Sequence, residues 1–518
     1  MKLAPAPSTR PLLLALAAAA ALAAPLAQAA DTTRVIVAYK PGATAAIRGA
    51  VSAARGAVAH EIFGMDAMAV EVPTQALAGL SRNPNVEYVE EDARRYPFAS
   101  ATPSTGSPYA TGQLVPYGIA MVQADQLADS VASSRKVCII DSGYDGGHED
   151  LDHSGNVTGE YDSGTGWWYM DENHHGTHVA GTISALNNSM GVVGVSENGT
   201  LKLHIVKVFG ADGWAYSSSL VTAANKCKAA GAHVISMSLG GSVSSRTEQN
   251  AFASLLSGGI LPIAAAGNGG NSRTSYPAGY ASVVSVAAID QNKAWATFSQ
   301  YNKDVEIAAP GVNVLSTVPM GSGRMPTLTV GGTTYVPGSM DGSPVGSATG
   351  ALADFGLGGT TLGGMTGKIC LIQRGTYDFA VKVSNCQASG GVGAVIYNNV
   401  AGDFSGTLGT TVTSIPSVTV SQADGAALLQ QVNQSATVGV GPSNYAYFDG
   451  TSMATPHVSA VAALVWARNP GCTASTLRTS LNLSAQDLGA AGRDTKFGYG
   501  LVQAKAADDR IKAQGCGK

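Results

Sequence analysis

Three polar residues, each at the end of an apolar segment, are the candidates for chemistry in this chain. Asp141 follows the apolar run VCII, His175 precedes an apolar helix-like segment, and Ser452 follows a Gly-Thr turn and precedes another. A serine hydroxyl becomes a good nucleophile only when a neighbouring imidazole takes its proton, and that imidazole needs a carboxylate to fix its tautomer. Together, the three residue types predict nucleophilic hydrolysis through a covalent intermediate.

Each of the three residues also has an ordinary structural explanation when it is taken alone. An aspartate after a strand commonly closes a turn or caps a helix, and a serine after a Gly-Thr turn is a common N-cap. His174 and His178 are four residues apart, like zinc ligands on a helix, but His175 replaces the glutamate that the HExxH pattern requires. A metalloprotease is therefore the weaker alternative.

The three segments resemble the signature blocks of one enzyme family. DSG, HGTHVAGT and GTSMATPHVSA are similar to the blocks of subtilisin-like serine proteases, the subtilases of peptidase family S8. The resemblance covers about residues 113–319 and 443–505, in the chain order Asp, His, Ser. It implies a serine endopeptidase that hydrolyses peptide bonds in proteins through an acyl-enzyme, with Asp141, His175 and Ser452 as its catalytic residues.

Two further blocks carry the resemblance to the substrate site. ILPIAAAGNGG resembles the oxyanion segment, which implies that the Asn268 amide and the backbone N–H of Ser452 stabilise the developing negative oxygen. SMSLGG resembles the edge strand that pairs with an extended peptide. Because the implied walls of the S1 pocket are small and uncharged, we expect a broad protease that prefers a large apolar P1 residue, the residue before the cut bond. The substrate-binding residues are Ser238, Leu239 and Gly240 of the strand and Ala265, Ala266 and Gly267 of the pocket.

The segment SALNNSMGVVGV resembles the calcium loop of the family. All the positions that match its ligands offer oxygen atoms, as a hard cation requires. An ordinary Asn-Asn turn is the alternative. The resemblance implies a structural Ca²⁺ held by the side chains of Gln113, Asp150 and Asn188 and the carbonyls of Leu186, Met190 and Val192.

Composition and pattern favour a folded α/β protein. The chain has 518 residues, of which 64 are glycine, with 45% hydrophobic and 13% charged residues. Its formal net charge of −4 offers no basic field, so neither a nucleic acid nor an anionic membrane is expected as a partner. Short apolar runs alternate with helix-length segments, which predicts a parallel sheet covered by helices on both faces. The runs are at 137–140, 203–209, 233–239, 260–267 and 283–289. This subtilisin-like sheet would belong to a catalytic domain of residues 113–319 and 442–518.

The N-terminus has the layout of a secretory signal peptide over residues 1–29. Lys2 and Arg10 precede an apolar run that ends in the pattern AQA at 27–29. A membrane anchor is the alternative, but the apolar part is short for a span of about 20 residues. We therefore expect a secreted, extracellular protein with no membrane contact after cleavage.

Residues 30–96 alternate between strand-like and helix-like segments, which predicts a small α+β unit. The unit resembles the inhibitor-type (I9) propeptide of subtilases, including its ending VEYVEED. Such a propeptide acts as an intramolecular chaperone and inhibitor until it is removed. The linker 97–112 is rich in Pro, Ser, Thr and Gly, so cleavage is expected within it, with Tyr109–Ala110 as one position.

Residues 320–441 interrupt the α/β pattern with strand-like runs, which predicts a β-rich inserted domain. The stretch GKICLIQRGTYDFAVKVSNCQASGGVGAVIYNN resembles a protease-associated (PA) domain. Such an insert either covers or extends the cleft and influences the choice of protein substrate, or serves as a spacer.

The six cysteines are an even number, which favours disulfides in an exported protein although fifteen connectivities are possible. Proximity favours Cys370–Cys386 and Cys472–Cys516, which leaves Cys138–Cys227 by elimination.

Two other functions stay open beside the broad protease. One is a selective processing protease of the same family. The other is a non-catalytic peptide-binding homologue, which the unaltered triad and Asn268 disfavour. The expected partners are protein and peptide substrates and the chain's own propeptide, and a monomer is expected.

Overall fold

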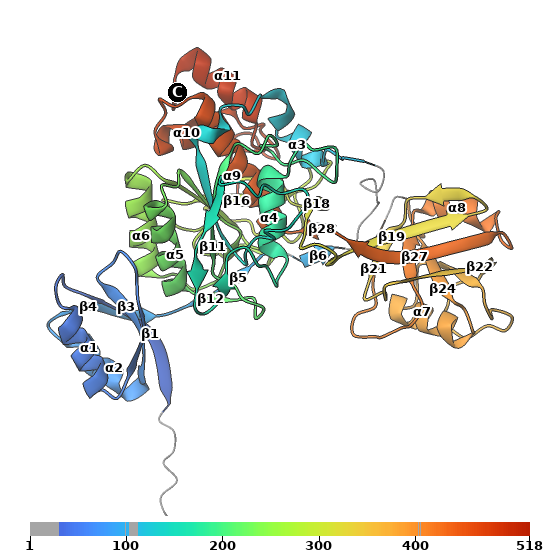
Figure 1. The fold of residues 1–518 in the computed structure, drawn as a ribbon, viewed down its shortest axis with the longest axis horizontal. Helices are drawn as coiled ribbons and strands as arrows, with labels where there is room; N and C mark the ends of the chain where they lie inside the picture. Colours follow the sequence, from blue (N-terminus) through green and yellow to red (C-terminus); the bar gives the residue numbers. More distant parts are fainter. Residues whose placement is uncertain (1–30, 99, 103–111, 402–403, 405) are drawn as a thin grey trace, which may run out of the picture.

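Two smaller units flank a central α/β domain (Figure 1). The structure is a computed structural model, and it describes residues 31–98, 100–102, 112–401, 404 and 406–518. The expected signal peptide and the Tyr109–Ala110 bond lie outside the described residues. In Figure 1 the N-terminal unit is blue at the lower left, and the inserted unit lies at the right in yellow and orange.

The central domain contains a seven-stranded sheet in the order β17-β16-β15-β13-β7-β11-β8, and every neighbouring pair is parallel. The five strands predicted from apolar runs are all present, and the short strands β8 and β17 form the two edges. The predicted parallel sheet is therefore confirmed. The strands are β7 Lys136–Asp141, β8 Val157–Gly159, β11 Lys202–Lys207, β13 Val234–Met237, β15 Leu261–Ala265, β16 Val284–Ile289 and β17 Ile307–Pro310.

β7 is the first strand of this sheet in chain order, and later strands pair with both of its edges. β11 lies on one side of β7 and β13 on the other. The crevice at the carboxyl end of such a strand is where open α/β sheets bind ligands. Asp141 is the last residue of β7 and therefore lies at this crevice.

Helices cover both faces of the sheet because side chains along a strand point alternately to its two sides. Val137 and Ile139 pack with α4 and α9, whereas Cys138 and Ile140 pack with α5 and α6. All of α9 except its last residue is buried, which fixes its N-terminus in the domain. The helices are α3 Tyr117–Met121, α4 His175–Ser184, α5 Ser217–Ala229, α6 Arg246–Ser257, α9 Thr451–Arg468, α10 Ala474–Ser484 and α11 Ala504–Gln514.

The N-terminal unit is the small α+β unit that the sequence predicts. Its antiparallel sheet has the order β2-β3-β1-β4, and α1 packs on one face. The other face packs on the central domain, where Ile36 and Ile62 share an apolar cluster with Val221 of α5 and Ala251 of α6. The elements are β1 Thr32–Tyr39, α1 Thr44–Ala53, β2 Ala57–Glu61, β3 Ala67–Pro73, α2 Leu77–Ser81 and β4 Val86–Glu91.

The inserted unit is built on a nine-stranded sheet, as the β-rich pattern predicts. The chain leaves the central domain along β18 (Val314–Thr317) and returns along β28 (Tyr445–Asp449), and these strands pair antiparallel. The next pair outward, β19 and β27, is also antiparallel, so two adjacent chain segments attach the insert. Its elements are β19 Gly323–Val330, β20 Thr333–Tyr335, β21 Gly338–Asp341, β22 Gly346–Asp354, β23 Ile369–Gln373, α7 Phe379–Ala388, β24 Gly393–Tyr397, β25 Gly406–Thr407, β26 Ser417–Val420, α8 Gln422–Leu429 and β27 Ser435–Ser443.

Three disulfides connect these elements. Cys138–Cys227 joins β7 to α5, Cys370–Cys386 joins β23 to α7, and Cys472–Cys516 joins the segment before α10 to the segment after α11. These are the pairs predicted from the sequence. Among the helices that the structure describes, none has both the length and the apolar character needed to cross a bilayer.

Candidate active site

A buried aspartate–histidine pair lies at the carboxyl end of β7. Nδ1 of His175 and Oδ1 of Asp141 are 2.7 Å apart, and the residues are 3% and 0% exposed. The backbone N–H of Ser142 donates to the same Oδ1 and helps to fix the carboxylate. Within the described part of the chain, Nε2 of His175 has no hydrogen-bond partner. The pair therefore leaves one imidazole nitrogen available to accept a proton.

Asp171 holds the N-terminus of α4, where His175 is the first helical residue. Oδ2 of Asp171 accepts hydrogen bonds from the backbone N–H and the hydroxyl of Thr177, at 2.8 and 2.6 Å. The Ser142 hydroxyl donates to Oδ1 of Asp171 and accepts from the N–H of Gly176, both at 2.8 Å. Asp171 thus fixes the helix that carries the imidazole. Sequence reasoning missed it, although an acidic residue just before a helix is a common capping signal.

Ser452 lies near the start of α9 and is fully buried. Its hydroxyl donates to the carbonyl oxygen of Ser238 at 2.8 Å and accepts from the backbone N–H of Phe98 at 2.9 Å. The hydroxyl therefore contacts a chain segment that crosses the site.

The carbonyl oxygen of Phe98 lies between two N–H donors. Nδ2 of Asn268 is 2.8 Å from it, and the backbone nitrogen of Ser452 is 3.3 Å from it. Thr451 orients the Asn268 amide, because its backbone N–H and its hydroxyl donate to Oδ1 at 2.9 and 2.8 Å. Donors that converge in this way stabilise negative charge on a carbonyl oxygen.

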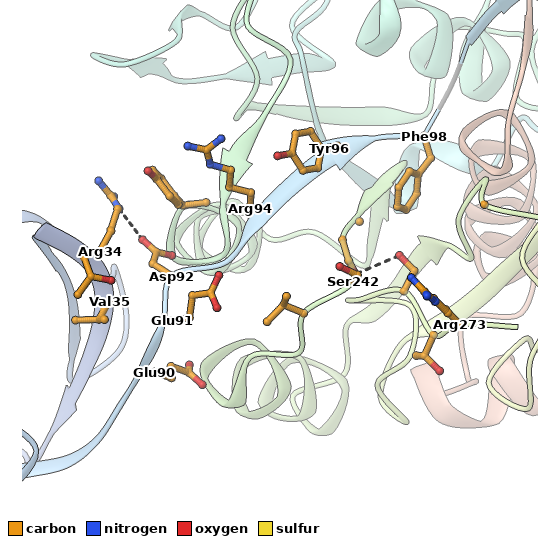
Figure 2. A pocket seen from close by; sticks show the side chains of 18 of the residues that line it. Arg34, Val35, Glu90, Glu91, Asp92, Arg94, Tyr96, Phe98, Ser242 and Arg273 are labelled. Carbon is orange, nitrogen blue, oxygen red and sulfur yellow. Dashed lines mark hydrogen bonds and ion pairs between the residues drawn. The ribbon is translucent and has the colours of Figure 1, made fainter. Parts of the chain in front are cut away.

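The segment that carries Phe98 is bound as an extended strand. β5 (Arg94–Pro97) lies antiparallel between β12 (Ala215–Tyr216) and β14 (Leu239–Gly240). Phe98 continues the pairing by donating its N–H to the carbonyl of Ser238 at 3.2 Å. Figure 2 shows this segment running from the N-terminal unit across the cleft to Phe98. The strand that the sequence predicts to bind peptides therefore pairs here with a segment of its own chain.

The ring of Phe98 lies against Gly240, which has no side chain. A Cβ on Gly240 would be 2.5 Å from Cε2 of Phe98, so a larger residue there would collide with the ring. The other predicted wall residues, Ala265, Ala266 and Gly267, are buried at the end of β15 and immediately before Asn268. The wall at Gly240 thus leaves room for a large ring.

The chain that follows residue 99 is also paired with a strand of the central domain. β6 (Ser100–Thr102) pairs antiparallel with β28 of the central domain. Extended segments therefore lie on both sides of the peptide bond after Phe98, and Ser452 lies next to the residue before that bond.

The six residues predicted to bind calcium come together in the structure. Three carbonyl oxygens converge on Nε2 of Gln113, at 2.6 Å for Leu186, 2.9 Å for Met190 and 3.1 Å for Val192. Oδ1 of Asn188 is 3.5 Å from the same nitrogen, and Oδ2 of Asp150 accepts from the N–H of Val192. Oδ1 of Asp150 is buried and has no hydrogen-bond partner among the described residues. Burial raises the pKa of this carboxyl to about 7. An oxygen-rich cluster with a free carboxylate oxygen fits a hard cation.

The two histidines that were considered as zinc ligands, His174 and His178, have structural positions instead. His178 is buried, stacks on Phe448 with ring centroids 4.3 Å apart, and contacts the carbonyls of Val314 and Ala446 through Nε2. Burial lowers its pKa to about 3. His174 is the N-cap of α4, in the left-handed conformation. His178 is therefore a neutral core residue, and the helix spacing reflects packing.

Comparison with known proteins identifies the family. The sequence profile of the Subtilase family matches residues 132–352, and that of the PA domain matches residues 336–428. Alkaline elastase YaB from Bacillus sp. (strain YaB) is 30% identical over 453 residues, which cover 86% of this chain and 81% of that protein. The chain belongs to the subtilase family. The resemblance of the three signature blocks is thereby confirmed.

Other relatives of this subtilase match over shorter stretches. Subtilisin BL from Lederbergia lenta is 45% identical over 212 residues, which cover 40% of this chain and 76% of that protein. An alkaline protease from Alkalihalobacillus alcalophilus is 40% identical over 265 residues, and the match spans 50% of this chain and 64% of that relative's length. The crystal structure of the psychrophilic subtilisin-like protease Apa1 from Pseudoalteromonas sp. AS-11 matches with a TM-score of 0.66 and 46% identity, covering 78% of this chain and all of that one.

The N-terminal unit of the subtilase binds the ends of two helices through carboxylates. Glu90 accepts hydrogen bonds from the backbone N–H groups of Arg246 and Thr247, at 2.8 and 3.0 Å, at the start of α6. Asp92 accepts from the N–H of Ser218, at 2.9 Å, at the start of α5. Helix N-termini favour such negative groups, so these contacts fix the unit against the cleft.

Proposed function

We propose that this subtilase is a secreted serine endopeptidase that cuts proteins through an acyl-enzyme. The observation that carries the proposal is the Phe98 carbonyl, whose oxygen lies between Asn268 Nδ2 and the Ser452 N–H. The Ser452 hydroxyl contacts the N–H of the same residue. A peptide bond held in this way has a nucleophile beside it and donors on its oxygen. The arrangement supports catalysis over the alternative of a non-catalytic peptide-binding homologue.

The reaction begins when the Ser452 hydroxyl exchanges its bond to Ser238 for one to Nε2 of His175. Oγ then bonds to the carbonyl carbon, the proton moves to Nε2, and the negative oxygen is stabilised by Asn268 and the Ser452 N–H. Collapse of this intermediate breaks the C–N bond, and His175 gives its proton to the leaving amine. Asp141 stabilises the imidazolium, and water repeats the steps on the acyl-enzyme to release the acid.

The N-terminal unit is the propeptide in this proposal, and the maturation site is the bond after Phe98. β5 and Phe98 occupy the cleft as a substrate strand would, so the unit blocks the site until it is cut off and released. Its sheet and its two helix-capping carboxylates also complete the packing on α5 and α6, which supports a role as a folding chaperone.

The experiment that tests the proposal is self-cleavage of the full precursor. We expect intact-mass and N-terminal measurements to find a first cut after Phe98, giving a mature chain that begins at Ala99. Phe98→Asp should slow this cut by at least about 10-fold, because it brings a charge to an apolar wall. The matched change Tyr109→Asp should leave the cut unaffected. A folded wild-type chain that stays intact would contradict the proposal, and a first cut at Tyr109–Ala110 would contradict the site.

The fit of the Phe98 ring beside Gly240 supports a preference for large apolar P1 residues in protein and peptide substrates. Backbone pairing with β12 and β14 does not depend on side chains, which supports broad specificity over the alternative of a selective processing protease. Three disulfides support secretion. The PA insert lies next to β28, the strand that pairs with residues 100–102, which supports a role in the choice of protein substrates. We expect the mature enzyme to be a monomer.

A structural Ca²⁺ is proposed for the cluster around Gln113. Three carbonyls converge on its Nε2, and Asp150 keeps a buried oxygen without a partner. Exchange of the two ends of the Gln113 amide would turn its oxygen toward the cluster, which gives an all-oxygen set with one carboxylate. The ion would join the segment before α3 to the loop after α4.

Removal of calcium is expected to lower the thermal stability of the PMSF-inhibited mature enzyme. At 100 times the dissociation constant a single ion adds about 2.7 kcal/mol, which corresponds to a Tm difference of about 4–5 °C in a domain of this size. Differential scanning calorimetry with and without EGTA measures the difference. Asp150→Asn should abolish it, whereas Asp212→Asn, at an exposed loop position, should retain it. A Tm that does not respond to calcium in the wild type would exclude the site.

A further inference from the structure

One arginine of the strand that occupies the cleft is buried in the central domain. Arg94 and Tyr96 are exposed, whereas Arg95 between them is 0% exposed. With Phe98 as the P1 residue, Arg95 is the P4 residue, three positions earlier. A guanidinium is always charged, so its complete burial requires a specific partner.

That partner is Glu248, in the first turn of α6. Nε of Arg95 donates to Oε1 at 2.9 Å and Nη2 donates to Oε2 at 2.8 Å, so both carboxylate oxygens are used. Nη1 and Nη2 also donate to the carbonyls of Arg94 and Val243, each at 3.0 Å. Both side chains of the pair are 0% exposed. Two parallel bonds of this kind are the geometry that distinguishes arginine from lysine.

The pocket around the pair belongs to the central domain and has a fixed shape. The hydroxyl of Tyr280 donates to Oε2 of Glu248 at 2.9 Å, and the Ser245 side chain accepts from the Glu248 N–H at 3.1 Å. A Cβ on Gly241 would lie 3.1 Å from Nη1 of Arg95, so the glycine leaves room for the guanidinium. These residues stay with the enzyme when the N-terminal unit is released.

When the N-terminal unit is released, Arg95 leaves with it, and the buried carboxylate of Glu248 loses its cation. Burial raises the pKa of Glu248, and the charge of Arg95 opposes that effect. A buried carboxylate without its cation is unfavourable, and a new guanidinium in the same place would restore both bonds. A substrate that pairs with β12 and β14 as β5 does would place its P4 side chain there.

We propose that Glu248 gives the otherwise broad mature enzyme a preference for arginine at P4, together with a large apolar residue at P1. The inference rests on the proposed endopeptidase function and adds a charged specificity position to it. The sequence predicted no acidic position in the cleft, because Glu248 lies in a polar helical segment whose burial the sequence does not reveal.

The test uses the self-processed wild-type enzyme and p-nitroanilide peptides based on residues 95–98, Arg-Tyr-Pro-Phe, with arginine, lysine or norleucine at P4. We expect kcat/KM for arginine to exceed that for norleucine by about 10–100-fold, from charge-assisted hydrogen bonds. Lysine should lie between them, because an ammonium lacks the planar fork. Equal kcat/KM values for the arginine and norleucine peptides would overturn this inference but not the proposed endopeptidase function. Hydrolysis of none of the peptides would overturn the proposed function and this inference with it.

A variant then assigns the selectivity to one residue. In Glu248→Gln the ratio of kcat/KM for arginine to that for norleucine should fall to about 1, measured on enzyme whose active sites have been titrated. The matched variant Glu160→Gln, at a residue with 41% side-chain exposure, should keep the wild-type ratio. Retention of the full ratio in Glu248→Gln would overturn the assignment. The wild-type peptide series decides the inference by itself if the variant does not fold.

Discussion

Ser452→Ala is expected to abolish both self-cleavage and the hydrolysis of added protein. The hydroxyl contacts the residue whose carbonyl is held by Asn268 and the backbone, and alanine keeps those donors but removes the nucleophile. Loss of the serine lowers kcat by about 10⁶, a magnitude established on subtilisin itself. The purified chain should therefore retain its N-terminal unit, which intact-mass measurement over several days detects. Casein and a Phe-P1 chromogenic peptide should not be cut above background.

Two controls make this result specific. Ser475→Ala, at an exposed position of α10, should process and cut casein like the wild type. Wild type treated with PMSF after maturation should lose its activity, because the reagent modifies the nucleophilic serine. Self-cleavage that persists in Ser452→Ala would show that another group attacks the bond after Phe98.

Asp141→Asn is expected to lower the rate of self-cleavage by about 10⁴, with the precursor still folded. Oδ1 of Asp141 accepts the Nδ1 proton of His175 at 2.7 Å. An amide of the same size can offer an N–H in that place, which favours the tautomer whose Nε2 already carries a proton. His175 would then be unable to take the proton of the serine. The first-order rate constant of cleavage after Phe98, followed by intact mass, measures the effect.

The matched variant Asp509→Asn removes a carboxylate at an exposed position of α11. It should cleave itself at the wild-type rate. A wild-type rate in Asp141→Asn would mean that the carboxylate is not needed to orient the imidazole, and the proposed mechanism would be wrong.

The sequence predicts the sheet best where its strands are buried on both faces. β7, β11, β13, β15 and β16 are mostly apolar runs, because helices cover both sides of the central strands. The edge strands β8 and β17 are short and were not predicted. Their existence depends on a neighbour that offers free backbone groups, and a local pattern contains no information about that neighbour.

The candidate site likewise contains residues that local sequence predicts and residues that depend on distant segments. Asp141, His175, Ser452 and Asn268 occur in blocks whose local sequence is distinctive, so their roles could be predicted from resemblance. Phe98 could not be selected from the linker, because its position depends on the register of β5 between two distant strands. Glu248 and Arg95 were missed for a related reason, since a polar helix residue and an arginine at the end of the N-terminal unit reveal their pairing only when the two segments are brought together.

The PA unit is attached to the central domain through two adjacent antiparallel strands, and this attachment determines how the chain can accept an inserted domain. Thr317 and Tyr445 are direct cross-strand partners in β18 and β28, so their Cα atoms are about 5 Å apart. A two-residue turn could join strands at that spacing. The insert therefore occupies the tip of a hairpin, where a long addition adds little loop-closure entropy and leaves the strand register of the host unchanged. A gene could gain or lose the whole unit at this point without moving either half of the catalytic domain.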